Sequence, residues 1–316
     1  MTIQHALVTG GAGFIGSHVT DALIAEGWTV TVLDNLSSGK RAQVPAKATL
    51  VEADIRSPEA AALIRDGAFD LVCHLAAQID VRKSVTDPSF DVDVNIRGSL
   101  NLIEAVRASG SKTRMIFAST GGAVYGDFVT PPNLETYGKD PESPYGIAKF
   151  SVELYLAYYA RVHGLDYVAL RFANVYGPRQ DPHGEAGVVA IFCQRIIKGT
   201  PLTVFGDGGQ TRDYVYVGDV ARAHVLATHH AGIAAGKVDD RAFNLGTGVE
   251  TSVVQLAESM FKAAAKRVEL QNAPHRPGEQ RRSVVSIAKA AAGLGWTPQV
   301  GLDEGVARTY AWFAER

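Results

Sequence analysis

A glycine-rich run lies almost at the N-terminus: Thr9-Gly10-Gly11-Ala12-Gly13-Phe14-Ile15-Gly16. It follows the apolar residues Ala6-Leu7-Val8 and precedes residues 17–24, whose pattern is typical of a helix. The local order is therefore a strand, a glycine turn and a helix. A helix N-terminus offers unpaired N–H groups and a positive dipole to a pyrophosphate, and glycine lets the backbone approach that group closely. We expect this loop to bind a nucleotide.

Three glycines of this run are spaced as G-x-x-G-x-x-G, one residue wider at the front than the common dinucleotide fingerprint: Gly10, Gly13 and Gly16. A second strand is predicted over residues 30–33, and Asp34 follows it, at the distance from the glycines where a carboxylate binds a ribose 2′-hydroxyl. Asp34 therefore favours NAD over NADP. Lys40 and Arg41 lie close enough to keep NADP as a minor alternative.

Composition limits the function classes. The 316 residues are enough for one large or two moderate domains, and the net charge of −2 attracts neither nucleic acid nor an anionic membrane. The two cysteines, Cys73 and Cys193, have neither a pairing nor a metal-type spacing, so we expect no metal site. The first predicted strand begins a few residues after Met1, and no apolar run reaches membrane-spanning length. We therefore expect a cytoplasmic protein.

Strand-like and helix-like segments alternate along the first half of the chain. Strands are predicted over 5–9, 29–34, 49–53, 71–75 and 115–118, and helices over 14–26, from Ser57-Pro58 onward, and over about 88–109. This alternation predicts an α/β fold with a Rossmann-type, doubly wound parallel sheet. A Gly/Pro-rich loop at 174–184 predicts the start of a smaller mixed α/β lobe. We expect an NAD-binding domain over 1–173, a substrate lobe over 174–316, and a return of 217–246 to the first sheet.

Small or polar residues follow three predicted strands: Asp54-Ile55, Leu75-Ala76-Ala77 and Ser119-Thr120. Ligands of doubly wound sheets bind at the carboxyl edge of the strands, so we expect NAD there. The predicted contacts are these residues, except Thr120, together with Gly10, Gly13, Phe14, Ile15, Gly16, Asp34 and Asn35. Asn95, within the predicted helix 88–109, is either a solvated polar residue or a further cofactor contact, and the sequence leaves both open.

A tyrosine and a lysine four residues apart, Tyr145 and Lys149, lie near the start of a predicted helix that follows Pro144. This spacing puts both side chains on one helix face. The tyrosine pKa, near 10, must fall by about three units, or about 4 kcal/mol, for a base that works at neutral pH. An ammonium group about 5 Å away supplies roughly 3 kcal/mol at an effective dielectric constant of about 20. The pair is therefore a candidate acid/base unit, although an ordinary amphipathic helix can carry the same two residues.

Together with the glycine loop and the Ser119-Thr120 turn, this pair resembles the extended short-chain dehydrogenase/reductase family, and within it the nucleotide-sugar epimerases and dehydratases. The resemblance runs from residue 6 to about 310. It implies that Tyr145 is the acid/base, that Lys149 binds the nicotinamide ribose, and that a hydroxyl of the turn contacts the sugar. The family's usual catalytic Ser or Thr is missing, because Gly121 stands at its position. We assign that role to Thr120, with Ser119 as the alternative.

The residues of this turn differ between family members that catalyse different reactions. The family's 4,6-dehydratases carry an Asp-Glu pair after the catalytic hydroxyl, and its decarboxylating members carry an acidic residue in the turn, whereas this chain has Gly122-Ala123. The resemblance thus implies C4 epimerisation of a UDP-hexose, UDP-glucose or UDP-galactose. UDP-glucuronate 4-epimerisation and nucleotide-sugar dehydration are the alternatives within the family. A catalytically silent NAD-binding scaffold or sensor is the alternative of another class.

The resemblance also implies substrate contacts in the second lobe: Arg212 and Arg276 on the diphosphate, Asn174 on the substrate, and Val189 near the base. In the family's UDP-galactose 4-epimerases one position beyond the second arginine loop restricts the sugar, and it falls at Ser283. A residue as small as serine implies that UDP-N-acetylglucosamine is accepted beside UDP-glucose.

The helix after Tyr145 carries apolar residues on nearly all sides: Phe150, Val152, Leu154, Tyr155, Leu156, Tyr158 and Tyr159. One core-facing stripe needs fewer, which indicates a partner on the opposite face. The family resemblance implies a homodimer in which this helix and the helix ending near Ser109 form a four-helix bundle.

Overall fold

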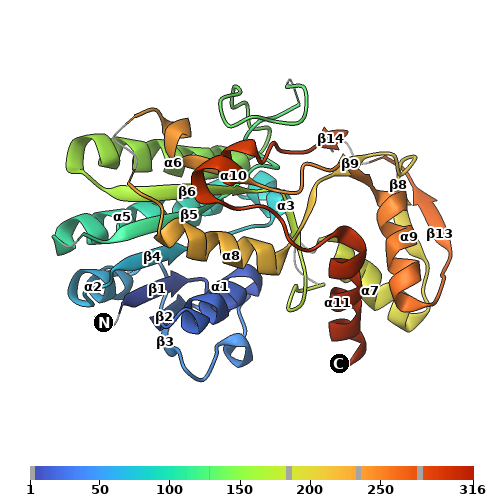
Figure 1. Ribbon diagram of the computed structural model, residues 1–316, viewed down its shortest axis with the longest axis horizontal. Coiled ribbons are helices and arrows are strands. Elements are labelled where there is room, and N and C mark those ends of the chain that lie inside the picture. Colours follow the sequence, from blue (N-terminus) through green and yellow to red (C-terminus); the bar gives the residue numbers. More distant parts are fainter. Residues whose placement is uncertain (1–3, 111, 128, 183–186, 233–235, 276–279) are drawn as a thin grey trace.

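The structure is a computed structural model that describes residues 4–110, 112–127, 129–182, 187–232, 236–275 and 280–316. Across these residues a parallel sheet of seven strands forms the larger part of the molecule (Figure 1). From edge to edge its strands are β11 (Ala242–Leu245), β6 (Asp166–Phe172), β5 (Arg114–Thr120), β4 (Leu71–His74), β1 (His5–Thr9), β2 (Thr29–Asp34) and β3 (Thr49–Glu52). The strand order grows outward from β1 in both directions. This confirms the predicted doubly wound α/β sheet, with its switch point between β1 and β4.

Helices cover both faces of the sheet (Figure 1). One face packs on α2 (Pro58–Asp66), α5 (Gly98–Ser109) and α6 (Pro144–His163), and the other on α1 (Phe14–Ala25) and α8 (Val217–Thr228). Successive strand residues serve opposite faces: Val72 belongs to the first core, and Cys73 to the second. Strands buried on both faces explain the nearly continuous apolar runs in the sequence.

Serine caps set the start of two helices. Ser57 precedes α2 and accepts a hydrogen bond from the N–H of Ala60, and Ser143 precedes α6 and accepts one from the N–H of Gly146. In both helices proline occupies the first turn, where its missing N–H costs nothing. The Ser143-Pro144 start therefore fixes Tyr145 in the first turn of α6.

The predicted helix over 88–109 is interrupted. It consists of α4 (Pro88–Val92), a π-helical segment η2 (Asp93–Arg97) and α5. A π-helical turn takes an extra residue and changes the directions of the side chains that follow. A further short helix, α3 (Val81–Thr86), precedes α4 and was not predicted from the sequence.

The smaller lobe stands at the right of Figure 1. Its core lies among α7 (Val188–Lys198), α9 (Val253–Ala264) and α11 (Leu302–Ala314), with β8 (Leu202–Phe205) paired to β13 (Leu270–Ala273). Short strands join this lobe to the large sheet: β7 (Asn174–Tyr176) with β10 (Tyr214–Tyr216), and β9 (Thr211–Arg212) with β12 (Thr251–Ser252) and β14 (Arg282–Ser283).

Three segments that follow residue 173 pack with the large sheet. β11 pairs with β6, α8 packs on α1, and α10 (Ala288–Leu294) contacts both β11 and α8. The boundary at residue 173 itself stays a prediction. Among the residues described here, no helix combines the length and the apolar character that a membrane crossing requires.

Candidate active site

A cavity of about 580 Å³ lies at the carboxyl edge of the sheet, around the switch point. The ends of β1 to β5 and the start of α6 form its walls. The predicted cofactor contacts that line it are Gly10, Gly13, Phe14, Ile15, Gly16, Asp34, Asn35, Asp54, Ile55, Leu75, Ala76, Ala77, Ser119, Tyr145 and Lys149. Residues from six separate segments of the chain therefore meet at one cavity of the size that a nucleotide cofactor needs.

At two positions of the first loop, close contacts leave no room for a side chain, so glycine is required. Gly10 has a φ of 72°, and a Cβ there would lie 2.7 Å from the backbone nitrogen of Ala76. A Cβ on Gly16 would lie 2.1 Å from the carbonyl oxygen of Gly10. Without these side chains the first turn of α1 comes close to the end of β1, and its N–H groups border the cavity. A pyrophosphate fits there.

Asp34 joins the end of β2 to this loop. Its carboxylate accepts hydrogen bonds from the N–H of Ala12 (3.0 Å) and of Leu36 (2.9 Å). The side chain borders the cavity, where a ribose hydroxyl can reach it. Asn35 donates to Asp54 (3.0 Å), whose pKa is lowered chiefly by its hydrogen bonds from Arg56. The glycine loop and the ends of β2 and β3 are thus held together by side-chain contacts.

Asn95 is not among the described residues that line this cavity. Its amide nitrogen donates to the carbonyl oxygen of Gln78 (2.9 Å) and to Asp91 (3.0 Å), and its oxygen accepts from the N–H of Gln78 (2.9 Å). At 2% exposure Asn95 is not a solvated residue, so that alternative is wrong. Its direct contact with a cofactor stays a prediction, while its bonds to Gln78 shape the cavity wall.

Tyr145 and Lys149 lie on one face of α6, as their spacing predicts. Lys149 is 4% exposed, its Nζ donates to the carbonyl oxygen of Ala118 (2.9 Å), and it lies 5.9 Å from the centre of the Tyr145 ring. Burial lowers the pKa of Lys149 to about 8, and the charges of Asp91 and Glu153 oppose that shift. An ammonium group at this distance stabilises a tyrosinate.

The hydroxyl groups of Ser119 and Thr120, at the end of β5, have different surroundings. Ser119 donates to Glu153 (2.5 Å) and is buried. A Cβ on Gly121 would lie 2.9 Å from Val285 Cγ1 and 3.2 Å from the carbonyl oxygen of Arg171, so a serine at that position would require these buried neighbours to shift. Ser119 lines the cavity with its hydroxyl held by Glu153, whereas Thr120 lies beside Gly122 and is not among the described lining residues, so the catalytic role of Thr120 stays a prediction.

The predicted substrate contacts belong to the second lobe and its connections. Asn174 is exposed at the start of β7, Val189 is buried in α7, and Arg212 lies in β9. Ser283, in β14, pairs in register with Arg212. A Cβ on Gly122 would lie 3.9 Å from Thr120 Oγ1 and 4.0 Å from Ser283 Oγ, so the turn and β14 approach each other. Arg276 lies outside the described residues.

A loop of the second lobe that was not predicted as part of the site also lines the cavity, at Arg179, Gln180 and Asp181. Arg179 pairs with Asp21 of α1 (2.7 Å), and His18 bonds to the carbonyl oxygen of Pro178 (2.9 Å). The loop is therefore attached to α1 over the glycine turn. In the sequence it is part of the Gly/Pro-rich run 174–184, from which only Asn174 was predicted as a site residue.

Comparison with known proteins agrees with this geometry. The profile of the NAD dependent epimerase/dehydratase family matches residues 6–246. The chain belongs to this family. One member, the UDP-glucose 4-epimerase of Mycolicibacterium smegmatis, is 44% identical over 99% of both chains. The glycine loop and Asp34 fit NAD, the cofactor of the family.

Solved structures of the epimerase/dehydratase family superpose closely. The UDP-glucose 4-epimerase of Thermotoga maritima with UDP-glucose has a TM-score of 0.94 and 47% identity over 99% of each chain. The UDP-glucose 4-epimerase of Thermus thermophilus with NAD has a TM-score of 0.90 and 46% identity over 98% of this chain and 99% of that one. The predicted family, cofactor and enzyme class are confirmed.

Two buried histidines, His74 in β4 and His224 in α8, predict a pH-dependent stability. Burial lowers the pKa of His74 to about 3 and that of His224 to about 4, from 6.5. Because the unfolded chain binds these protons first, stability is lost as the pH falls below 6.5. Between pH 7 and pH 5 each histidine should cost about 2 kcal/mol.

Urea unfolding of wild type and His224→Asn at both pH values tests this. The loss between pH 7 and pH 5 should be about 2 kcal/mol smaller in the variant, whereas His5→Gln, at an exposed position, should leave the loss unchanged. An equal loss in wild type and His224→Asn would contradict the assignment.

Proposed function

We propose that this protein is a UDP-hexose 4-epimerase that interconverts UDP-glucose and UDP-galactose. The observation that carries the proposal is the Tyr145–Lys149 pair at the wall of the NAD cavity, beside a turn without an acidic residue. Eliminating water would require an additional acid and base, whereas oxidising and reducing the same carbon requires one acid/base group. The names of the similar proteins support the same reaction.

In the proposed mechanism the side chains move one proton. When bound, NAD supplies the acceptor and then the donor of the C4 hydrogen. Tyr145, as phenolate, takes the proton of the C4 hydroxyl and later returns it, while the Lys149 ammonium stabilises the phenolate. The Thr120 hydroxyl holds the same sugar oxygen. The 4-keto sugar turns over in its pocket before C4 is reduced again, so there is no net redox change.

The second lobe would bind the nucleotide. Arg212 and Arg276 would hold the diphosphate through bidentate contacts, Asn174 would contact the substrate, and Val189 would lie near the base. Support comes from the register of β9 and β14, which sets Ser283 opposite Arg212 and near the Thr120 turn. The sugar would then lie between Arg212 and Tyr145.

We also infer a homodimer. On α6 five large apolar side chains are between 41% and 57% exposed: Ile147, Leu154, Tyr155, Tyr158 and Val162. A second copy that pairs α6 and α5 would cover them. Analytical ultracentrifugation of wild type and Leu154→Asp tests this, since the variant should sediment as a monomer. A cytoplasmic location is a further proposal, supported by two buried free cysteines, Cys73 and Cys193, which suit a reducing compartment.

One assay separates the candidate reactions. The protein is incubated with UDP-galactose, UDP-N-acetylglucosamine and UDP-glucuronate in turn, and the products are separated by chromatography. Formation of UDP-glucose from UDP-galactose supports the proposal. A 4-keto-6-deoxy product would identify a dehydratase, and turnover of UDP-glucuronate alone would identify the other epimerase. No turnover of any UDP-sugar would favour the silent scaffold.

The sugar preference should depend on Ser283. A tyrosine there would enter the space beside Thr120, so Ser283→Tyr should lower kcat/KM for UDP-N-acetylglucosamine at least about 10-fold more than for UDP-galactose, a difference of about 1.4 kcal/mol. The matched control is Ser283→Thr, which adds one methyl group and should change the ratio less than about 3-fold. Equal ratios in wild type and Ser283→Tyr would remove Ser283 from the specificity site.

A further inference from the structure

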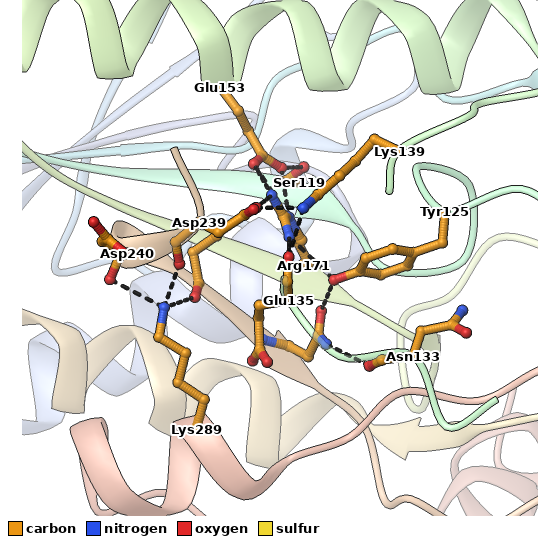
Figure 2. A network of polar contacts seen from close by, with 12 residues as sticks. Ser119, Tyr125, Asn133, Glu135, Lys139, Glu153, Arg171, Asp239, Asp240 and Lys289 are labelled. Atoms are coloured by element: carbon orange, nitrogen blue, oxygen red, sulfur yellow. Dashed lines mark hydrogen bonds and ion pairs between the residues drawn. The ribbon is translucent and has the colours of Figure 1, made fainter. Parts of the chain in front are cut away.

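A network of charged groups with a buried centre lies beside the end of β5, where it contacts Ser119 (Figure 2). At its centre the side chains of Glu153 and Arg171 are both 0% exposed, and they pair at 2.6 Å. Arg171 also donates to Asp239 (2.9 Å) and to the hydroxyl of Tyr125 (3.1 Å). A carboxylate buried in this way needs several partners, and Arg171 donates three hydrogen bonds to it, two from Nε and one from Nη2.

Glu153 stands on the catalytic helix. It follows Lys149 by four residues and Tyr145 by eight, so all three side chains lie on one face of α6. From that face two contacts reach the end of β5: Lys149 donates to the carbonyl oxygen of Ala118 (2.9 Å), and Glu153 accepts from the Ser119 hydroxyl (2.5 Å). Consecutive residues of the strand are therefore fixed to the helix that carries the acid/base pair.

The direction of Thr120 follows from that attachment. Successive side chains of a strand point to opposite faces. In β5, Phe117 packs in the core on the α6 side, and Ala118 packs in the core on the opposite side. Ser119 points to α6 like Phe117, as Figure 2 shows by its contact with Glu153. Thr120 is thereby turned the other way, and its Oγ1 lies 3.9 Å from a Cβ built on Gly122, which is also 4.0 Å from Ser283 Oγ.

We propose that Glu153 is a positioning residue of the active site: it engages the Ser119 hydroxyl, excludes it from the reaction, and so fixes Thr120 as the hydroxyl presented to the sugar. The effect rests on the proposed epimerase function, because it concerns which hydroxyl the substrate meets. It also accounts for the missing serine at position 121. The buried carboxylate of Glu153, one turn beyond Lys149, holds the end of β5 through Ser119. The next residue of the strand, Thr120, then carries the hydroxyl that is presented to the sugar.

The test compares Ser119→Ala, Thr120→Val and Glu153→Gln with wild type, using UDP-galactose. Thr120→Val removes a group that contacts the substrate and should lower kcat at least about 100-fold. Ser119→Ala should lower kcat about 10-fold through misplacement, with KM within about 2-fold of wild type. Ser119→Thr, which keeps the hydroxyl, should restore most of the lost kcat.

A double-mutant cycle measures the link between the two partners. Because Ser119 is proposed to act only through Glu153, the Ser119→Ala/Glu153→Gln double variant should be no slower than Glu153→Gln alone. The urea midpoints of the four proteins should be non-additive in the same sense. If Glu153→Gln does not fold, Ser119→Ala and Ser119→Thr still test the proposal, since both variants leave the Glu153–Arg171 ion pair intact.

Two results would overturn the proposal while wild type remains active: a loss in Ser119→Ala as large as in Thr120→Val, which would make Ser119 the reacting hydroxyl, or additive losses in the cycle. Absence of turnover in wild type would instead overturn the epimerase function, and the positioning role with it.

Discussion

Tyr145→Phe should lower kcat for the conversion of UDP-galactose to UDP-glucose by about 100- to 10,000-fold, the range that a general acid/base contributes. The phenolic hydroxyl is the only group that the variant loses, and KM should change little because the ring remains. The measurement is the initial rate of UDP-glucose formation with protein of matched NAD content.

The matched control for that variant is Tyr155→Phe, which removes a hydroxyl from the same helix at a position 41% exposed. It should keep the wild-type rate to within about 2-fold, because the variant keeps the ring that the proposed dimer covers and loses only a hydroxyl outside the active site. Full turnover by Tyr145→Phe would show that another group moves the proton, and the assignment of the acid/base residue would be wrong.

Arg171→Met should have the largest effect on stability. It removes the partner of a carboxylate that is 0% exposed, and leaving a buried charge unpaired costs about 3–5 kcal/mol. The measurement is the free energy of urea unfolding at pH 7. Arg171→Met/Glu153→Leu, which removes both charges, should recover part of the loss, because an apolar pair needs no compensation.

An exposed ion pair provides the control for Arg171. Arg282 pairs with Glu250, and the Arg282 side chain is 51% exposed. Arg282→Met should cost less than about 1 kcal/mol. Equal losses in Arg171→Met and Arg282→Met would mean that Glu153 is stabilised in the fold by other groups.

The cofactor half of the fold could be predicted from local signals. The glycine turn, the strand ending in Asp34 and the Ser143-Pro144 helix start each act within a few residues, and the rule that ligands bind at strand ends brought the predicted contacts to one cavity. The π-helical segment η2 could not be predicted this way. Asn95 lies in it and bonds to Gln78, seventeen residues earlier.

The sequence also could not indicate which of two adjacent hydroxyls is presented to the sugar. Ser119 and Thr120 are equivalent in any local pattern, and the distinction comes from Glu153, 34 residues later. No local pattern indicated the role of Arg171 either, because it lies in a mostly apolar strand and its four partners, Glu153, Asp239, Tyr125 and Glu135, are distant in sequence. Long-range contacts of this kind decide which side chain does the chemistry.

The position of β11 has a consequence for synthesis on the ribosome. β6 is complete at Phe172, but the strand that pairs with its outer side begins only at Ala242. At about 5–20 residues per second, the roughly seventy residues between them take several seconds to translate. During that time a nascent chain carries a bare, apolar sheet edge that can pair with other chains. A chaperone that shields this edge should therefore raise the yield of folded protein, and fragments that stop before residue 242 should aggregate.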